Sequence, residues 1–170
     1  MKRTRVLFLC TGNSARSQMA EAFLRQYGDD YFEVYSAGFE PKGINPYSIQ
    51  VMKEAGIDIS GQRSKNLSEY LWKVQFGYVI TLCSRAEQNC PIFPGVTTRL
   101  YWPFDDPAAG ERSDEERLAQ FRAVRDQIEQ KVRTWVGEMA VAYMRPGHNS
   151  QAALRKALRP TQSVSSCSNR

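Results

Sequence analysis

The sequence predicts a single α/β domain built in three layers, in which a four-stranded parallel sheet is flanked by helices. Three observations predict this fold class. Short apolar runs typical of strands alternate with helical stretches, an order that favours a parallel sheet with right-handed crossovers. The first run, at residues 6–9, is apolar without interruption, as a strand buried on both faces requires. The chain of 170 residues, 42% of them hydrophobic, is long enough for one domain with a substantial core.

The first half of the chain is predicted to continue as helix, strand and helix. A helix is expected to begin near Ser17, because the apolar side chains that follow recur on one face, and Gly28 is expected to end it. A second strand is predicted at residues 32–35. After a loop rich in glycine and proline, a second helix is predicted at residues 46–55, and Gly56 ends it.

The central part of the chain supplies the remaining strands. A short polar stretch with a helix around residues 68–72 precedes a core strand at residues 78–82, which ends at Cys83. Residues 83–94 lack strong periodicity and are expected to form a loop or a weak helix bounded by prolines. The last strand is predicted at residues 98–101.

A long helix is predicted to close the domain. Ser113 and Glu116 have the spacing of a capping box, which marks a helix start. We expect the helix to reach Met144, before Pro146 and Gly147 end it. Its apolar side consists of Leu118, Phe121, Val124, Ile128, Val132, Trp135, Val136 and Met139.

The formal net charge of +5 comes from the end of the chain. The basic surplus lies entirely after Met144, whereas the preceding residues carry equal numbers of basic and acidic side chains. We therefore expect a neutral domain at residues 1–144 and a basic, flexible tail at residues 145–170. Such a tail could contact RNA or an anionic surface. It has no aromatic residue to stack on bases, which favours a solvated appendage, with neither nucleic acid nor membrane as a partner.

The sequence predicts a cytoplasmic protein. Its first residues are too short and too charged for a secretory signal, and no stretch reaches the ~20 apolar residues of a membrane span. The balanced charge of the domain gives no sign of an obligate interface, so we expect a monomer. In a reducing compartment, four cysteines are more often catalytic or metal-binding than structural.

Residues 10–17 join the first strand to the first helix and form the chemical centre of the chain. Their small or turn-tolerant residues allow backbone N–H groups to point inward, and the helix adds its positive N-terminal end, which predicts a site for a tetrahedral oxyanion. Arg16 adds a planar fork of donors. Cys10 is then expected to be a thiolate nucleophile with a pKa well below about 8.5, the alternative being a buried core cysteine. The other substrate-binding residues of the loop are Thr11, Gly12, Asn13, Ser14 and Ala15.

Two further side chains are candidates for hydrogen bonding and proton transfer. Ser17 is expected to donate its hydroxyl to the Cys10 sulfur, and the alternative is a plain N-cap residue. Asp106, next to the rigid Pro107, is the candidate general acid that protonates a departing oxygen, and Asp105 is expected to be a surface carboxylate. The alternative is that both aspartates only shape a turn.

Cys83 and Cys90 are expected to approach Cys10. Cys10 and Cys83 end two core strands whose carboxyl ends share one sheet edge, where ligands bind in such folds, and Cys90 lies seven residues farther on. A zinc site is the competing interpretation, but the spacing is not C-x-x-C, and His148, the one histidine, lies in the tail. Cys167, in the serine-rich tail, is expected to be a free thiol.

Several segments resemble a known family. The chain is similar, over about residues 4–144, to the arsenate reductases built on the low-molecular-weight tyrosine phosphatase fold. The C-x5-R loop alone would indicate only a phosphate or arsenate site, and the two further cysteines make the resemblance specific. The segments that carry it are VLFLCTGNSARSQMAEAFL at 6–24, VYSAG at 34–38, KEAGIDIS at 53–60, TLC at 81–83 and FDDP at 104–107.

The resemblance implies a reaction, arsenate reduction for arsenic detoxification. Cys10 would attack the arsenic atom while Asp106 protonates the departing oxygen, and Cys83 would then attack the Cys10 sulfur and release arsenite. Cys90 would resolve the resulting disulfide to give Cys83–Cys90, which thioredoxin, or a glutaredoxin or mycoredoxin with a small thiol, would reduce. No cofactor is implied, and a weak side activity on aryl phosphates is expected.

The chain departs from the family pattern at two places. Relatives that bind potassium near the loop form the site from positions that correspond here to Asn13, Glu21, Ser36 and, in place of an acid, Lys65. The Lys65 ammonium would take over the role of the cation, so no metal ion is predicted. Ala15 stands where phosphatases of this fold often carry another cysteine, which the reductase sequence of steps does not need.

Two rival functions remain at this stage. A protein tyrosine phosphatase would share the first step, but thiols do not reduce phosphorus(V), so it gains nothing from Cys83 and Cys90. Alanines also stand at Ala108 and Ala109, directly after Pro107, where aromatic residues would flank a phosphotyrosine. The other rival is a non-enzymatic oxyanion or redox sensor that binds without turnover.

Overall fold

Four parallel strands form one sheet at the centre of the computed structural model, which describes residues 3–95 and 98–143. The strand order is β2-β1-β3-β4. The strands are β1 (Thr4–Cys10), β2 (Phe32–Gly38), β3 (Tyr78–Thr81) and β4 (Thr98–Tyr101). The predicted α/β class with a four-stranded parallel sheet is therefore confirmed. Within these ranges, no helix has both the length and the apolar character needed to cross a membrane.

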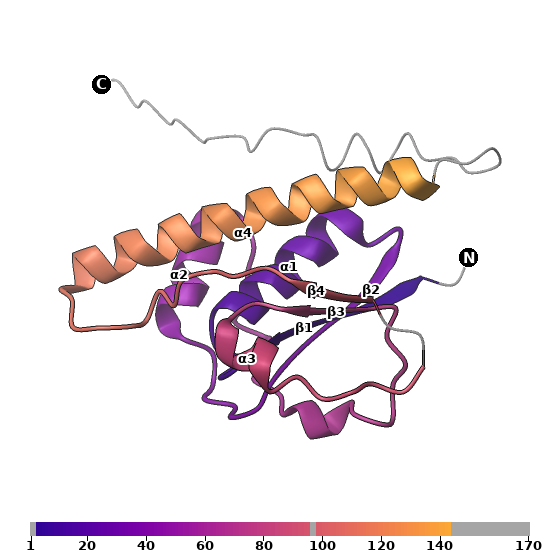
Figure 1. Cartoon of the computed structure of the whole chain (residues 1–170). Coiled ribbons are helices and arrows are strands. Elements are labelled where there is room, and N and C mark those ends of the chain that lie inside the picture. The colour runs from indigo at the N-terminus through magenta and orange to yellow at the C-terminus, as the bar shows by residue number, and fades with distance from the viewer. Residues whose placement is uncertain (1–2, 96–97, 144–170) are drawn as a thin grey trace.

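Helices lie on both sides of the sheet and complete the three predicted layers (Figure 1). The first side is covered by α1 (Arg16–Gly28), α2 (Pro46–Glu54) and α4 (Asp114–Tyr143). The short 3₁₀ helix η1 (Leu67–Glu69) and α3 (Ser84–Gln88) lie on the second side. Side chains of β2 pack on both sides of the sheet. Phe32 stacks on Trp135 of α4. Tyr35 contacts Tyr70 and Phe76.

The long helix α4 follows the sequence prediction closely. The Ser113 backbone N–H donates to the Glu116 carboxylate at 2.9 Å and the Glu116 N–H donates to the Ser113 hydroxyl at 3.2 Å, which completes the capping box. The predicted apolar side packs on the domain, with Ile128 and Val132 fully buried. The expected helix end at Met144 and the tail, with His148 and Cys167, lie outside the described residues.

Two local predictions need correction. The second strand extends three residues beyond the predicted Tyr35, to Gly38. The helix expected around residues 68–72 is a single 3₁₀ turn that ends at Glu69. The first helix ends at Gly28 as predicted, and Gly28 also has a packing role, because a Cβ there would lie 2.9 Å from side-chain atoms of Leu24 and Phe32.

The register of the sheet brings the candidate residues to one edge. Cys10, the last residue of β1, is paired with Gly38 at the end of β2. Leu9 is paired with Thr81, the last residue of β3, so Cys83 follows beside the residue after Cys10. The carboxyl ends of three neighbouring strands therefore meet where a parallel α/β sheet binds its ligands.

Candidate active site

The Cys10 sulfur lies at the base of the loop between β1 and α1. Cys10 is only 3% exposed, its sulfur is 2.8 Å from the Ser17 hydroxyl oxygen, and the Asn13 backbone N–H donates to it at 3.2 Å. The N-cap position of α1 is Ala15, and Ser17 lies inside the helix. The alternative role of Ser17 as the N-cap is therefore wrong, and its hydroxyl faces the sulfur as the main hypothesis expected.

The loop backbone has the orientation that an anion site requires. The carbonyl oxygens of Thr11, Gly12 and Ser14 accept hydrogen bonds from backbone N–H groups of the segment 40–45, which lies outside the loop. Because the two polar groups of a peptide unit point in opposite directions, N–H groups that follow these carbonyls turn toward the loop interior. The start of α1 adds the positive end of a helix to this set of donors.

Asn13 fixes the loop from within. It is fully buried and has a φ of 46°, a left-handed conformation that Asn tolerates better than most residues. Its side-chain amide donates to the hydroxyl oxygens of Ser17 at 2.8 Å and Ser36 at 2.9 Å. The buried Gln18 amide holds the Asn13 carbonyl at 3.0 Å, a contact that sequence reasoning missed because Gln18 looks like an ordinary polar helix residue.

Gly38 makes room for the loop at the end of β2. A Cβ at this position would lie 2.5 Å from the Thr11 carbonyl oxygen and 2.9 Å from the Asn13 nitrogen, closer than non-bonded atoms approach. Any larger residue would therefore push the loop away from the sheet. Gly38 belongs to the segment VYSAG that carried the family resemblance, but its packing role could not be deduced from its position in the sequence.

The Cys10 thiol is not the low-pKa group that the sequence predicted. Burial raises its pKa above the ordinary value, although the Ser17 hydrogen bond, the Arg16 charge and the Asn13 N–H each lower it. The physical reason is that the loop removes the sulfur from water, and this effect is larger than each of the three that oppose it.

Arg16 connects the loop to the predicted acid. Its guanidinium donates to the Phe104 carbonyl at 3.0 Å and lies 3.9 Å from the Asp106 carboxylate. Asp106 also accepts the Ala108 N–H at 3.0 Å, so it shapes a turn as the alternative hypothesis held. One carboxylate oxygen caps the turn while the other faces Arg16, so the turn contact leaves the second oxygen available for the predicted role as general acid.

Cys83 joins the loop from the neighbouring strand. Its sulfur is 3.6 Å from the Thr11 hydroxyl oxygen, one residue along the chain from Cys10. Cys83 is also the N-cap residue of α3, and its sulfur accepts the Ala86 N–H at 3.4 Å. The second thiol is thus buried beside the anion loop and oriented by a helix start.

Cys90 lies beyond the far end of α3 and is not in place to meet Cys83. It is partly buried, and its thiol donates to the Pro91 carbonyl at 3.7 Å. Burial raises its pKa, Arg99 lowers it and Glu87 raises it. The structure therefore brings Cys10, Arg16, Ser17, Cys83 and Asp106 together and leaves Cys90 apart.

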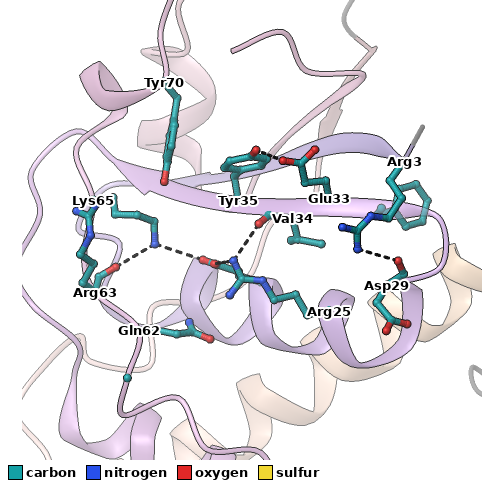
Figure 2. Close-up of a pocket in the computed structure, with 13 residues that line it drawn as sticks. Arg3, Arg25, Asp29, Glu33, Val34, Tyr35, Gln62, Arg63, Lys65 and Tyr70 are labelled. Carbon is teal, nitrogen blue, oxygen red and sulfur yellow. Dashed lines mark hydrogen bonds and ion pairs between the residues drawn. The ribbon is translucent and has the colours of Figure 1, made fainter. Parts of the chain in front are cut away.

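The residues predicted to replace a potassium site do form one cluster. The Glu21 carboxylate accepts from the Ser36 hydroxyl and lies 3.4 Å from the Lys65 ammonium and 2.5 Å from Arg25. Burial lowers the pKa of Lys65, and the Glu21 charge opposes that effect. Glu21, Arg25 and Lys65 of this cluster line a pocket of about 700 Å³, whose lining does not include Cys10. Figure 2 shows Arg25 and Lys65 among the residues that line this pocket.

Over residues 3–95 and 98–143, no three His, Cys, Asp or Glu side chains form a group that could hold a metal ion. The Lys65 ammonium lies 3.4 Å from the Glu21 carboxylate. Ser36, in turn, connects Glu21 to Asn13 and so to the catalytic loop.

Comparisons with known proteins agree with this geometry. An arsenate reductase from Halalkalibacterium halodurans is 47% identical over 135 residues, which are 79% of this chain and 96% of that protein. The solved structure of an arsenate reductase in the phosphate binding state matches with a TM-score of 0.63 at 32% identity, over 79% of this chain and 98% of the other. The structure of a thioredoxin-dependent arsenate reductase from Corynebacterium glutamicum matches with a TM-score of 0.62 at 27% identity. The match covers 84% of this chain and 64% of that chain.

The family assignment follows from the same comparisons. The model of the family described as low molecular weight phosphotyrosine protein phosphatase matches residues 5–143, nearly all of the described structure. The resemblance inferred from the motifs is confirmed. The chain belongs to the low molecular weight phosphotyrosine protein phosphatase family and, within it, is similar to arsenate reductases.

Proposed function

We propose that the protein is an arsenate reductase that converts arsenate to arsenite and passes the oxidation through Cys10, Cys83 and Cys90. The observation that carries the proposal is the 3.6 Å contact between the Thr11 hydroxyl and the Cys83 sulfur, which holds a second thiol beside the loop that contains Cys10. A site that only hydrolyses phosphate esters needs one thiol. A site that reduces its substrate with its own thiols needs two, because the two electrons leave a disulfide behind.

The first step forms a covalent bond between the Cys10 sulfur and arsenic. The loop N–H groups and Arg16 bind the oxyanion, and the buried thiol attacks while one oxygen leaves. The Cys10 thiol loses its proton as the sulfur–arsenic bond forms, and the departing hydroxyl takes up one proton and leaves as water. Asp106, next to Arg16, is suited to relay this one proton to the departing oxygen.

The second step moves two electrons to arsenic. The Cys83 thiolate attacks the Cys10 sulfur, a sulfur–sulfur bond forms, the sulfur–arsenic bond breaks, and its electron pair leaves with arsenic as arsenite. The Ala86 N–H and the Thr11 hydroxyl contact the Cys83 sulfur and orient it beside the loop that contains Cys10. The product on the protein is a disulfide between Cys10 and Cys83.

The third step requires α3 to unwind. Cys83 and Cys90 flank the five-residue helix α3, which by itself is about 7.5 Å long. A disulfide needs Cα atoms within about 7 Å. Cys90 therefore reaches the Cys83 sulfur only when α3 opens, and its attack releases Cys10 and leaves the disulfide Cys83–Cys90 for a thioredoxin-type reductant.

The Lys65 ammonium takes the place of a bound cation in this proposal. Its positive charge lies 3.4 Å from Glu21, and Glu21 is connected through Ser36 to Asn13, which orients the loop. The enzyme would therefore work without potassium or another metal. It would act as a monomer in the cytoplasm, where a reducing environment keeps its thiols ready.

A phosphatase is the second candidate, because the family is described by that activity and Cys10, Arg16 and Asp106 suffice for it. A weak phosphatase activity on aryl phosphates is compatible with reduction, since both reactions share the first step. A sensor that binds oxyanions without turnover would use the same loop. Of these candidate functions, only the reductase needs the Cys83 thiol to react.

A coupled assay separates the three functions. The full chain is incubated with arsenate, thioredoxin, thioredoxin reductase and NADPH, and NADPH oxidation is followed. Reductase function predicts turnover that Cys83→Ser and Cys90→Ser each abolish. Turnover that survives Cys83→Ser undiminished would contradict the three-thiol order, whereas aryl phosphate hydrolysis without NADPH oxidation would indicate a phosphatase, and arsenate binding without either reaction a sensor.

A further inference from the structure

The Glu87 carboxylate fastens the last turn of α3 to two strands. One of its oxygens accepts from the Thr81 hydroxyl at the end of β3, and the other lies 3.0 Å from the Arg99 guanidinium of β4. Arg99 also donates to the Glu87 backbone carbonyl. A single residue of α3 is thus held by both its side chain and its main chain. We call Glu87, Thr81 and Arg99 the latch.

The latch is more protected from water than the other charged contact of α3. Thr81 is fully buried, the Glu87 side chain is 32% exposed and the Arg99 side chain is 41% exposed. Arg85, on the same helix, pairs with Glu40 at 2.5 Å, but these two side chains are 60% and 51% exposed. A partly buried, charge-assisted hydrogen bond contributes more than an exposed ion pair. The latch is therefore the stronger of the two attachments.

The latch holds the helix that separates the Cys83 and Cys90 thiols. Glu87 lies between Cys83 and Cys90, three residues before the second cysteine. The helix that the latch holds is the one that must open before the two sulfurs meet. Arg99 and Glu87 also act on the Cys90 thiol, Arg99 lowering its pKa and Glu87 raising it, so both partners of the ion pair are close enough to influence the third thiol.

We propose that the latch stabilises the reduced form of the Cys83–Cys90 pair by holding α3 wound, and so sets how readily the pair becomes a disulfide. Glu87 is in this account a positioning residue, since it acts on the thiols through the helix. The inference rests on the proposed function for its place in the reaction. The latch contacts exist only with α3 formed, so by linkage their removal favours the disulfide.

The test measures the thiol–disulfide equilibrium directly. The full chain with Cys10→Ser and Cys167→Ser is equilibrated with mixtures of reduced and oxidised glutathione, quenched with acid and analysed by mass spectrometry. One oxidised glutathione takes up the two electrons of the pair and yields two reduced glutathiones. The variants are Glu87→Ala and Thr81→Val, the second of which removes only the hydroxyl. Glu54→Ala is the matched control, because Glu54 pairs with Arg122 and Arg125 away from α3.

The proposal predicts that Glu87→Ala shifts the equilibrium about tenfold toward the disulfide, as expected for loss of a charge-assisted hydrogen bond. Thr81→Val should shift it in the same direction by less, and Glu54→Ala should leave it unchanged. Thermal unfolding adds a readout that a general structural role would not produce. Glu87→Ala should lower the melting temperature of the reduced form and leave that of the disulfide form unchanged.

The outcome separates this inference from the proposed function. An unchanged equilibrium in Glu87→Ala, or equal loss of melting temperature in both forms, would overturn the latch. Because glutathione replaces arsenate in the experiment, a shifted equilibrium would support the latch even if the chain failed to reduce arsenate. The arsenate assay and this equilibrium can therefore fail independently.

Discussion

Cys10 and Cys90 occupy opposite kinds of environment in one small domain. Cys10 is buried in a loop fixed by Asn13 and Ser17, and both contact its sulfur. Cys90 is partly buried after a five-residue helix, and its thiol reaches the Pro91 carbonyl at 3.7 Å. The first region is built to hold a geometry, and the second is held by a few contacts that can be released.

The contrast indicates how the two tasks of the proposed reaction are divided. Bond formation to arsenic needs donors and nucleophile in place before the substrate arrives. Transfer of the disulfide to a site where an external reductant can reach it needs a thiol whose position can change, and Cys90 is that thiol in the proposed reaction. Cys83 belongs to both regions, since it contacts Thr11 of the loop and begins α3. Changes in the rigid region should therefore affect the first step, and changes in α3 should affect only the last.

The largest expected effect comes from Cys10→Ser. A hydroxyl is a far weaker nucleophile toward the bound oxyanion, so arsenite formation should fall on the order of 10⁴-fold or more. Arsenite released per protein, measured after acid quench, checks this. Undiminished arsenite formation by the variant would contradict the role of Cys10 as the nucleophile.

Asp106→Asn should give the next largest effect. Without a proton donor for the departing oxygen, the first step should slow by about 10²- to 10³-fold. Rapid-quench measurement of arsenite in the first turnover reports this step before thioredoxin acts. Asp105→Asn is the matched control and should leave the rate within about twofold. Equal losses in both variants would assign Asp106 to the turn alone.

Ser17→Ala tests the environment of the Cys10 sulfur. Burial raises the Cys10 pKa and the Ser17 hydrogen bond lowers it, so the variant should move the pKa farther upward. Alkylation of Cys10 by iodoacetamide should rise with pH through a midpoint above the ordinary value of about 8.5, and Ser17→Ala should shift that midpoint higher and slow alkylation at pH 8 about tenfold.

The sign of the Cys10 effect also has a consequence for stability. Because the folded thiol keeps its proton at pH values where the unfolded thiol has lost it, the free energy of unfolding should fall as pH rises above about 8.5. Ser48→Ala is the control, since the Ser48 hydroxyl faces the Ser14 carbonyl instead of the sulfur. A Cys10 midpoint below that of free cysteine would contradict the burial argument.

The smallest expected effect comes from Arg85→Ala in α3. Arg85 loses its exposed contact with Glu40, and exposed pairs contribute little, so the Cys83–Cys90 equilibrium should move toward the disulfide by about twofold. Arg63→Ala, which removes an exposed pair with Glu69, serves as control. A larger shift for Arg85→Ala than for Glu87→Ala would show that the main attachment of α3 is at Arg85 and would contradict the latch.

The sequence predicted most of the fold because local signals agreed with the tertiary structure. The capping box at Ser113 and the apolar side of the last helix could be predicted from the local sequence alone, without knowing which elements the helix packs against. The strand at residues 98–101 was also correctly bounded. The helix end at Gly28 was predicted, but the packing of Gly28 against Phe32 was not, because it depends on a contact between elements.

The candidate site was predictable in its residue types and less so in its energetics. Cys10, Arg16 and Cys83 follow from motif and strand order. The raised pKa of Cys10 does not, because burial depends on how the loop closes over the sulfur. The attachment of Glu87 to Thr81 was equally hidden, since the charge of β4 and the buried hydroxyl meet only in the folded sheet.

The most direct test of the division between the two regions is a single-turnover experiment with Cys90→Ser. The reduced variant is mixed with arsenate in the absence of any other thiol, and arsenite and disulfides are quantified. The account predicts one arsenite per protein and a trapped disulfide between Cys10 and Cys83. Arsenite formation without that disulfide, or no arsenite from a protein that binds arsenate, would contradict it.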